Sequence, residues 1–182
     1  MTDQRPSDDT PRPSMPRQFR HRPSRRVVAD ADALPRLFAA CCESAFTVEL
    51  GVADPPVVDY MTDLLMRFLH CDEFQRFRSP TGQTLASVPE LLIEAEDREG
   101  PARSAMLRHV GDVTLFWTGV YPEALPRVQR DQVIDLPACG QRSYRLASGG
   151  EAESVLGRIA DEYAVCRDGL HRARLIWEDL RN

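Results

Sequence analysis

The feature that most limits how this chain can fold is a dense apolar run, RHVGDVTLFWTGVYPE, over Arg108–Glu123. Pro101 and Pro122 bracket it, and proline fits the first turn of a helix and disfavours helix in the residue before it. We therefore expect a helix over residues 101–121. Apolar residues recur along it at spacings of three and four, and its second half is apolar nearly all round, which indicates burial on several sides. The stripe consists of Ala102, Met106, Val110, Val113, Trp117 and Val120.

Helix-start signals divide the rest of the chain into further helices. Asp54 precedes Pro55, Ser87 stands three residues before Glu90 as in a capping box, and Asp135 precedes another apolar segment. No alternating strand pattern stands out. We therefore expect an all-α single domain of five or six helices around the buried central helix. The other helices are expected at about 33–50, 54–71, 87–96, 136–147 and 156–180.

The C-terminal segment has the most regular pattern. From Leu156 to Leu180 apolar residues alternate spacings of three and four, over roughly three and a half heptads. One unbroken helix would span roughly 36 Å, against a domain radius of gyration of about 15 Å. We expect its C-terminal half either to expose an apolar edge for a homodimer or another protein's helix, or to be covered by this same chain. The interface candidates are Leu170, Ala173, Trp177 and Leu180.

The N-terminal segment differs in composition from the rest. Residues 1–26 are rich in Pro, Arg, Ser and Asp and have a formal charge of +4, against −9 for the remainder. Too little apolar surface is present to offset the entropy of ordering, so we expect a disordered basic tail over residues 1–30 and a helical domain over 31–182. Prolines and acids interrupt the positive charge and no aromatic residues are interleaved. We therefore favour a solvated extension over an arm for nucleic acid or an anionic surface.

Composition excludes some chemistry. The chain has no lysine, which excludes Schiff-base catalysis and the phosphate-binding loop that needs a lysine amine. Its five cysteines are odd in number and form no C-x-x-C pair, so we expect reduced thiols rather than an exported disulfide framework. No signal peptide is visible, and no run reaches the roughly 20 apolar residues of a membrane span. We expect a cytoplasmic protein without a membrane partner.

The central helix carries the best candidate for acid–base chemistry. His109 and Asp112 are three apart, so a carboxylate can orient an imidazole for proton transfer. The alternative is a polar seam at the edge of a buried helix, in which Arg108 or a neighbouring backbone satisfies Asp112. No serine, cysteine or second carboxylate is tied to the pair by spacing. We therefore favour the polar seam and assign no catalytic residue.

Ligand and metal sites were weighed in the same way. Trp117 and Tyr121 are four apart and are placed to line an apolar pocket, although aromatic residues at helical spacing are more often core. With His109 and Asp112 they form the weak set of ligand-binding candidates. Metal sites usually show paired ligands at close spacing. Here the only close pairs of a histidine and a cysteine are His70–Cys71 and Cys166–His171, and the side chains of the second pair point about 140° apart on a helix. We expect neither a metal nor a cofactor.

The central pattern, preceded by YMTDLLMRFL and followed by SYRLAS, resembles a family of uncharacterised bacterial all-helical proteins. Three features occur in the family's order: Gly111-Asp112, Leu115-Phe116 and a Gly-x-x-Pro-Glu end from Gly119 to Glu123. The resemblance covers residues 54–148. It implies an all-α fold and no particular activity, and Pro137 stands where it implies uninterrupted helix.

Two functions follow from these observations. We expect a non-enzymatic interaction or accessory protein of a bacterial cytoplasm, because a long heptad-like helix and a charged tail accompany no recognisable catalytic set. The alternative is a helical protein, with or without catalytic activity, that binds a small molecule or cofactor near His109, Asp112 and Trp117. A pocket open to solvent beside His109 would favour the alternative, and a filled core there would favour the first.

Overall fold

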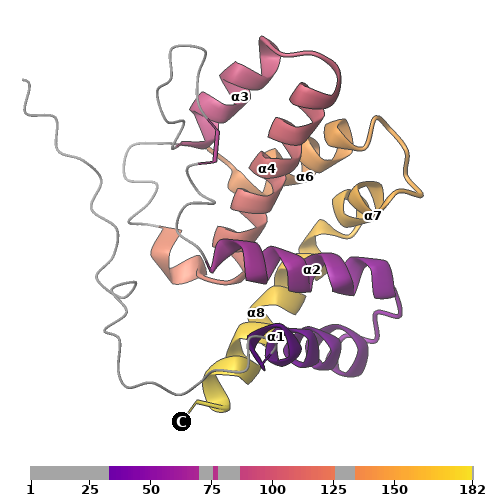
Figure 1. The fold of residues 1–182 in the computed structure, drawn as a ribbon, viewed down its shortest axis with the longest axis vertical. Coiled ribbons are helices and arrows are strands. Elements are labelled where there is room, and N and C mark those ends of the chain that lie inside the picture. Colours follow the sequence, from indigo (N-terminus) through magenta and orange to yellow (C-terminus); the bar gives the residue numbers. More distant parts are fainter. Residues whose placement is uncertain (1–32, 70–75, 78–86, 126–133, 182) are drawn as a thin grey trace, which may run out of the picture. The chain divides into compact units, whose positions relative to one another are not determined.

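The helices of the described chain run from α1 to α8 (Figure 1). The computed structural model describes residues 33–69, 76–77, 87–125 and 134–181, all within the unit Ala31–Asn182. This part of the chain contains helices and no strand, which confirms the all-α prediction. The tail expected over residues 1–30 lies outside the described residues. The elements are α1 (Ala33–Glu43), η2 (Ser44–Glu49), α2 (Pro55–Phe68), α3 (Val88–Glu96), α4 (Gly100–Gly119), η4 (Pro122–Ala124), α6 (Leu136–Ala147), α7 (Val155–Asp161) and α8 (Tyr163–Asp179).

Three helices begin at the residues that their cap signals predicted. The Asp54 carboxylate accepts a hydrogen bond from the Val57 amide at the start of α2, at 3.3 Å. Ser87 and Glu90 form the complete capping box of α3. Asp135 caps α6, with Pro137 in the first turn, where a proline costs no helical hydrogen bond. These starts depend on local groups alone, which is why the sequence shows them.

The central helix, α4, is confirmed in place and in burial. Every residue from His109 to Val120 is buried. The N-terminal half is less covered, and Ala102, at the start of the predicted stripe, is exposed. Four helices pack against α4 and bury it: α2, α3, α6 and α8. Of these, α6 lies alongside α4 (Figure 1).

The first helix differs from its prediction in its last turn. An α-helix to Leu50 was expected, but the chain changes to a π-helix, η2, at Ser44, and the Leu50 amide donates to the Ala45 carbonyl five residues earlier. The wider turn brings Phe46 fully into the core. Val48, two residues further on, faces outward and is 77% exposed.

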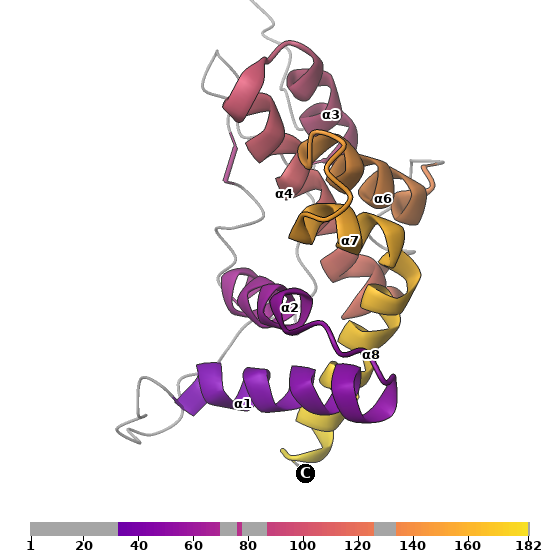
Figure 2. The same ribbon diagram turned by 90° about the vertical axis from the view of Figure 1, so that its right-hand side faces the viewer.

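The last helix is not the unbroken element that the heptad pattern predicted. It is divided at Glu162 into α7 and α8, which run in different directions (Figure 2). Gln141 of α6 donates its side-chain amide to the Ala160 carbonyl at 2.8 Å. In an unbroken helix that carbonyl accepts the amide of residue 164. The division explains why the described residues hold seven α-helices rather than six.

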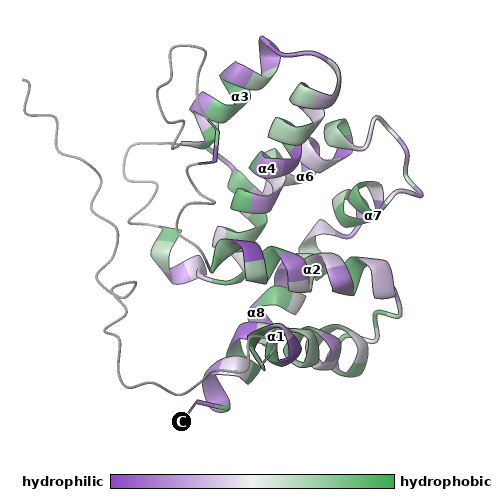
Figure 3. Cartoon of the chain, viewed as in Figure 1, coloured by the Kyte–Doolittle hydropathy of each residue, from purple (hydrophilic) through white to green (hydrophobic). Residues whose placement is uncertain are grey.

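Most helices carry apolar residues on one side and polar residues on the other (Figure 3). The apolar side of α8 packs against α1, η2 and α4, and the Trp177 ring meets the Phe38 ring edge-on with centroids 5.1 Å apart. Across the described residues, no helix combines the length and apolar character needed to cross a membrane.

Candidate functional site

The most concentrated polar chemistry of the described chain surrounds Asp112, in the middle of α4. Its side chain lies in the core, and the residue is 3% exposed. Carboxylate Oδ1 accepts hydrogen bonds from the hydroxyls of Tyr60, at 2.5 Å, and Tyr144, at 2.7 Å. Oδ2 accepts one from Nη2 of Arg67, at 3.0 Å. Helices α2, α4 and α6 therefore meet at one buried carboxylate.

Arg108 forms the outer edge of this group. Its Nε donates to the Tyr60 hydroxyl oxygen at 3.0 Å and lies 3.9 Å from Oδ2 of Asp112. Its guanidinium also lies over the Tyr60 ring, 4.9 Å from the centroid, where a cation is attracted to the ring face. The prediction that Arg108 satisfies Asp112 is thus only partly right, because the direct hydrogen bonds come from other helices. We call Tyr60, Arg67, Arg108, Asp112 and Tyr144 the Asp112 cluster.

Backbone spacing explains how the cluster assembles. Tyr60 and Arg67 are seven residues apart on α2, which is close to two full turns, so they point to the same side. The Tyr144 ring reaches the Asp112 carboxylate by lying across Gly111, where no side chain is in the way. A Cβ built on Gly111 would lie 2.7 Å from Cε1 of that ring. Glycine at this position is what lets α6 approach α4 so closely.

Burial dominates the titration behaviour of the cluster. It raises the pKa of Asp112, while the Arg67 charge and the two tyrosine hydroxyls oppose that rise. Burial, and then the Asp112 charge, raise the pKa of Tyr60 and of Tyr144. Both phenols therefore remain protonated donors at neutral pH. The arrangement suits fixed hydrogen bonding rather than proton transfer to a substrate.

A second buried polar contact joins α4 to α8. The Tyr163 hydroxyl donates to Oγ1 of Thr114 at 3.2 Å, and Thr114 donates to the Val110 carbonyl of its own helix at 2.8 Å. Burial raises the pKa of Tyr163 to about 12. Gly140 of α6 faces both groups, and a Cβ there would collide with Oγ1 of Thr114 and with the Tyr163 hydroxyl. The buried polar contacts of α4 with Tyr144 and with Tyr163 thus both lie where a glycine lets another helix pack closely.

The four ligand-binding candidates lie in different surroundings. His109 is 2% exposed, and its imidazole lies near the rings of Phe68 and Phe77, at 6.3 and 5.0 Å between centroids. Asp112 belongs to the cluster described above. Trp117 is buried against Phe116. Tyr121 is half-buried, with the Arg174 guanidinium 4.5 Å from its ring centroid.

The four interface candidates are divided between core and surface. Leu170 and Ala173 are buried within this chain. Trp177 is half-buried, and Leu180 is 67% exposed. Only the last turns of α8 therefore leave part of the predicted edge open.

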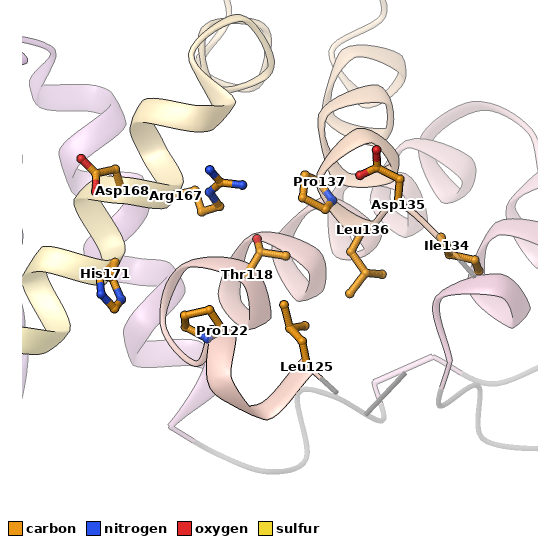
Figure 4. Close-up of a pocket in the computed structure, with 10 residues that line it drawn as sticks. All are labelled: Thr118, Pro122, Leu125, Ile134, Asp135, Leu136, Pro137, Arg167, Asp168 and His171. Atoms are coloured by element: carbon orange, nitrogen blue, oxygen red, sulfur yellow. The ribbon is translucent and has the colours of Figure 1, made fainter. Parts of the chain in front are cut away.

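Two cavities that described residues line bear on the site. One, of about 590 Å³, lies beside the cluster and is bordered by Tyr60 and Arg108 together with Asp59, Asp63 and Glu151. The other, of about 510 Å³, lies where α8 faces the end of α4 and the start of α6, and Arg167 and His171 line it (Figure 4). Neither cavity is lined by His109, Asp112 or Trp117.

Four of the five cysteines belong to the described residues. Cys41, Cys42, Cys139 and Cys166 are free thiols, and burial raises the pKa of Cys42 and of Cys166 to about 12, which disfavours the reactive thiolate. The adjacent His70 and Cys71 lie outside the described residues. Within the described ranges, no three His, Cys, Asp or Glu side chains are grouped so as to hold a metal ion.

Sequence reasoning missed Tyr60, Arg67 and Tyr144 as partners of Asp112. Tyr60 and Arg67 both belong to α2. Their seven-residue separation was the available signal, since it places both on one side of the helix. No comparable signal identified Tyr144, which comes from a helix distant in sequence.

Comparisons of the chain with protein-family models, with curated proteins and with solved structures found no match. The resemblance noted from the central motif stays a prediction.

Proposed function

We propose that this chain is a non-enzymatic interaction or accessory protein of a bacterial cytoplasm. The observation that carries the proposal is the state of the Asp112 carboxylate. Each of its oxygens accepts a hydrogen bond from this chain's own side chains, and the residue is 3% exposed. A general acid or base needs hydrogen-bond reach to a substrate. The Asp112 carboxylate, the side chain best suited to acid–base chemistry, instead joins helices α2, α4 and α6 through these hydrogen bonds.

The proposed contact surface lies where the start of α1 meets the end of α8. The Phe38–Trp177 ring contact joins these two helix ends. Leu34 is one helical turn before Phe38 and is 41% exposed, and Leu180 follows Trp177 by three residues and is 67% exposed. The Arg181 guanidinium lies 5.9 Å from the Trp177 ring centroid. Contiguous exposed apolar patches mark interaction sites, and tryptophan and arginine are enriched at protein–protein interfaces. We call Leu34, Trp177 and Leu180 the terminal patch, and propose that it supports a homodimer.

Sedimentation equilibrium of the full chain over a wide concentration range tests this proposal. Leu180→Glu is the informative variant, because its side chain is mostly exposed and its loss leaves the Phe38–Trp177 contact intact. We expect the wild type to dimerise and L180E to remain monomeric. Ile93→Glu, which changes an equally exposed apolar residue on α3, should behave as the wild type. A wild type that is monomeric throughout, or an L180E variant that dimerises normally, would rule out self-association through this patch.

A further inference from the structure

We propose that the cavity beside Arg167 and His171 binds a small organic carboxylate, with a single negative charge and an apolar body. The site is independent of the Asp112 cluster and of the terminal patch. In Figure 4 the Arg167 and His171 side chains enter from α8 on one side, and the start of α6 forms the other side. Three features carry the inference: two nitrogen groups without hydrogen-bond partners among the described residues, two bordering carboxylates that limit the charge of the ligand, and an apolar wall.

The nitrogen groups share one face of α8. Arg167 and His171 are four residues apart, so their side chains lie one above the other. In the described part of the chain, the Arg167 guanidinium has no ion-pair partner and extends toward Pro137 across the cavity (Figure 4). Nδ1 of His171 is buried and also has no hydrogen-bond partner among these residues. Buried polar atoms are nearly always paired, so this imidazole nitrogen and the Arg167 guanidinium are the groups on this face of α8 that a ligand can pair with.

The acceptor that fits a guanidinium best is a planar anion. Two parallel N–H groups of arginine match the two oxygens of a carboxylate, which gives a short, charge-assisted pair. A neutral carbonyl ligand would leave the arginine charge uncompensated in a partly apolar site. The pairing therefore selects for a charged oxygen group.

Nearby carboxylates limit how much negative charge the cavity accepts. Asp135 and Asp168 also border it. Both have partners, since Asp135 accepts from the Ala138 amide at 3.0 Å and Asp168 from Nε of Arg172 at 3.1 Å. Their charges nevertheless repel a dianion. One free arginine between two carboxylates thus favours a carboxylate ligand over a phosphate.

Apart from Thr118, whose hydroxyl donates to the Thr114 carbonyl of its own helix at 2.7 Å, the remaining lining is apolar and indicates that the body of the ligand is apolar. The volume of about 510 Å³ falls within the range of roughly 300–1,000 Å³ typical of small-molecule sites. Prolines and aliphatic side chains offer no specific hydrogen bonds, so they suit an alkyl or aryl group. The apolar residues are Pro122, Leu125, Ile134, Leu136 and Pro137.

Calorimetric titration of the full chain tests the proposal. The probes are hexanoate and phenylacetate, with hexanamide, phenylacetamide and inorganic phosphate as matched comparisons. We expect saturable binding of at least one carboxylate at one site per chain, and none of its amide or of phosphate. Arg167→Met keeps the aliphatic stem and should bind the carboxylate at least about tenfold more weakly, because a charged hydrogen-bond pair is lost. Arg103→Met, at an exposed position of α4 outside the cavity, should bind as the wild type.

Several outcomes would overturn the inference. They are no binding of either carboxylate, equal binding of the amides, undiminished binding by R167M, or a preference for phosphate. If R167M does not fold, NMR titrations of the wild type with hexanoate and with phenylacetate, read for whichever carboxylate binds in calorimetry, decide instead. Shifts centred on the Arg167 Nε and His171 ring resonances support the site, and shifts elsewhere or none at all reject it.

Discussion

Gly111 of α4 and Tyr144 of α6 lie in direct contact, with the tyrosine ring placed over the glycine backbone. A Cβ at position 111 would come within 2.7–2.8 Å of three ring carbons. The ring is fully buried, and its hydroxyl is fixed by a hydrogen bond to Asp112, so it has little room to move. The packing of α6 against α4 at this point thus depends on the absence of one methyl group.

Gly111→Ala should therefore destabilise the fold, although alanine is the better helix former. Overpacking a rigid core typically costs about 1–3 kcal/mol, against a propensity gain of about 1 kcal/mol. We expect a lower free energy of unfolding in urea. Ala105→Gly, at an exposed position of the same helix, measures the propensity effect alone. A G111A variant as stable as the wild type would show that the Tyr144 ring can move aside at little energetic cost.

Asp112→Asn should also destabilise the fold. The amide keeps the shape of the carboxylate but removes the charge that Arg67 pairs with and places N–H donors toward other donors. Breaking such a partly buried network costs about 2–4 kcal/mol. Urea unfolding at neutral pH measures the loss, and Asp59→Asn, at an exposed position of α2, is the matched control. Equal stability of the two variants would contradict a structural role for the cluster.

The same variant should alter how stability depends on pH. Burial raises the pKa of Asp112 above its ordinary value of 3.8, so the folded chain keeps this proton to a higher pH than the unfolded chain. The contribution of the group to stability therefore declines as pH rises from 3.8 to the folded pKa, and is constant above it. The difference in unfolding free energy between wild type and D112N should shrink over that window. An increase over the same window would contradict the raised pKa.

Arg174 should contribute more to the free energy of unfolding than Arg145 of α6, whose ion pair is exposed. Its Nη1 donates to the Val120 carbonyl, at 2.6 Å, and pairs with Glu123, also at 2.6 Å, so it joins the C-terminal end of α4 to α8. Arg174→Met should lower the free energy of unfolding by about 1.5–3 kcal/mol, the usual range for hydrogen bonds to charged groups. Arg145→Met, which breaks an ion pair between two exposed side chains, should change it little. Similar losses in the two variants would count against the role of Arg174.

Trp117→Ala tests the burial of the central helix. The indole is 8% exposed and packs against Phe116, so its removal should cost about 3–5 kcal/mol through lost transfer energy and a cavity. Chemical denaturation measures the change. A loss below about 1 kcal/mol would be inconsistent with a packed tryptophan.

Local features could be predicted from the sequence because their causes are local. The caps at Asp54, Ser87 and Asp135 act on amides within three residues, and the burial of α4 follows from an apolar surface that no neighbouring segment needs to specify. The all-α class and most helix starts are thus determined by the sequence alone and can be predicted from it.

Other features depend on partners that are distant in sequence. The heptad pattern from Leu156 to Leu180 suits one long helix, but the division at Glu162 lets Tyr163 reach Thr114 and lets Gln141 occupy the Ala160 carbonyl. The partners of Asp112 come from positions 45 to 52 residues before it and 32 after it. Helical periodicity describes only the direction in which a side chain points on its own helix. Which groups meet a buried carboxylate is decided when the helices pack, because only packing brings them within hydrogen-bond distance.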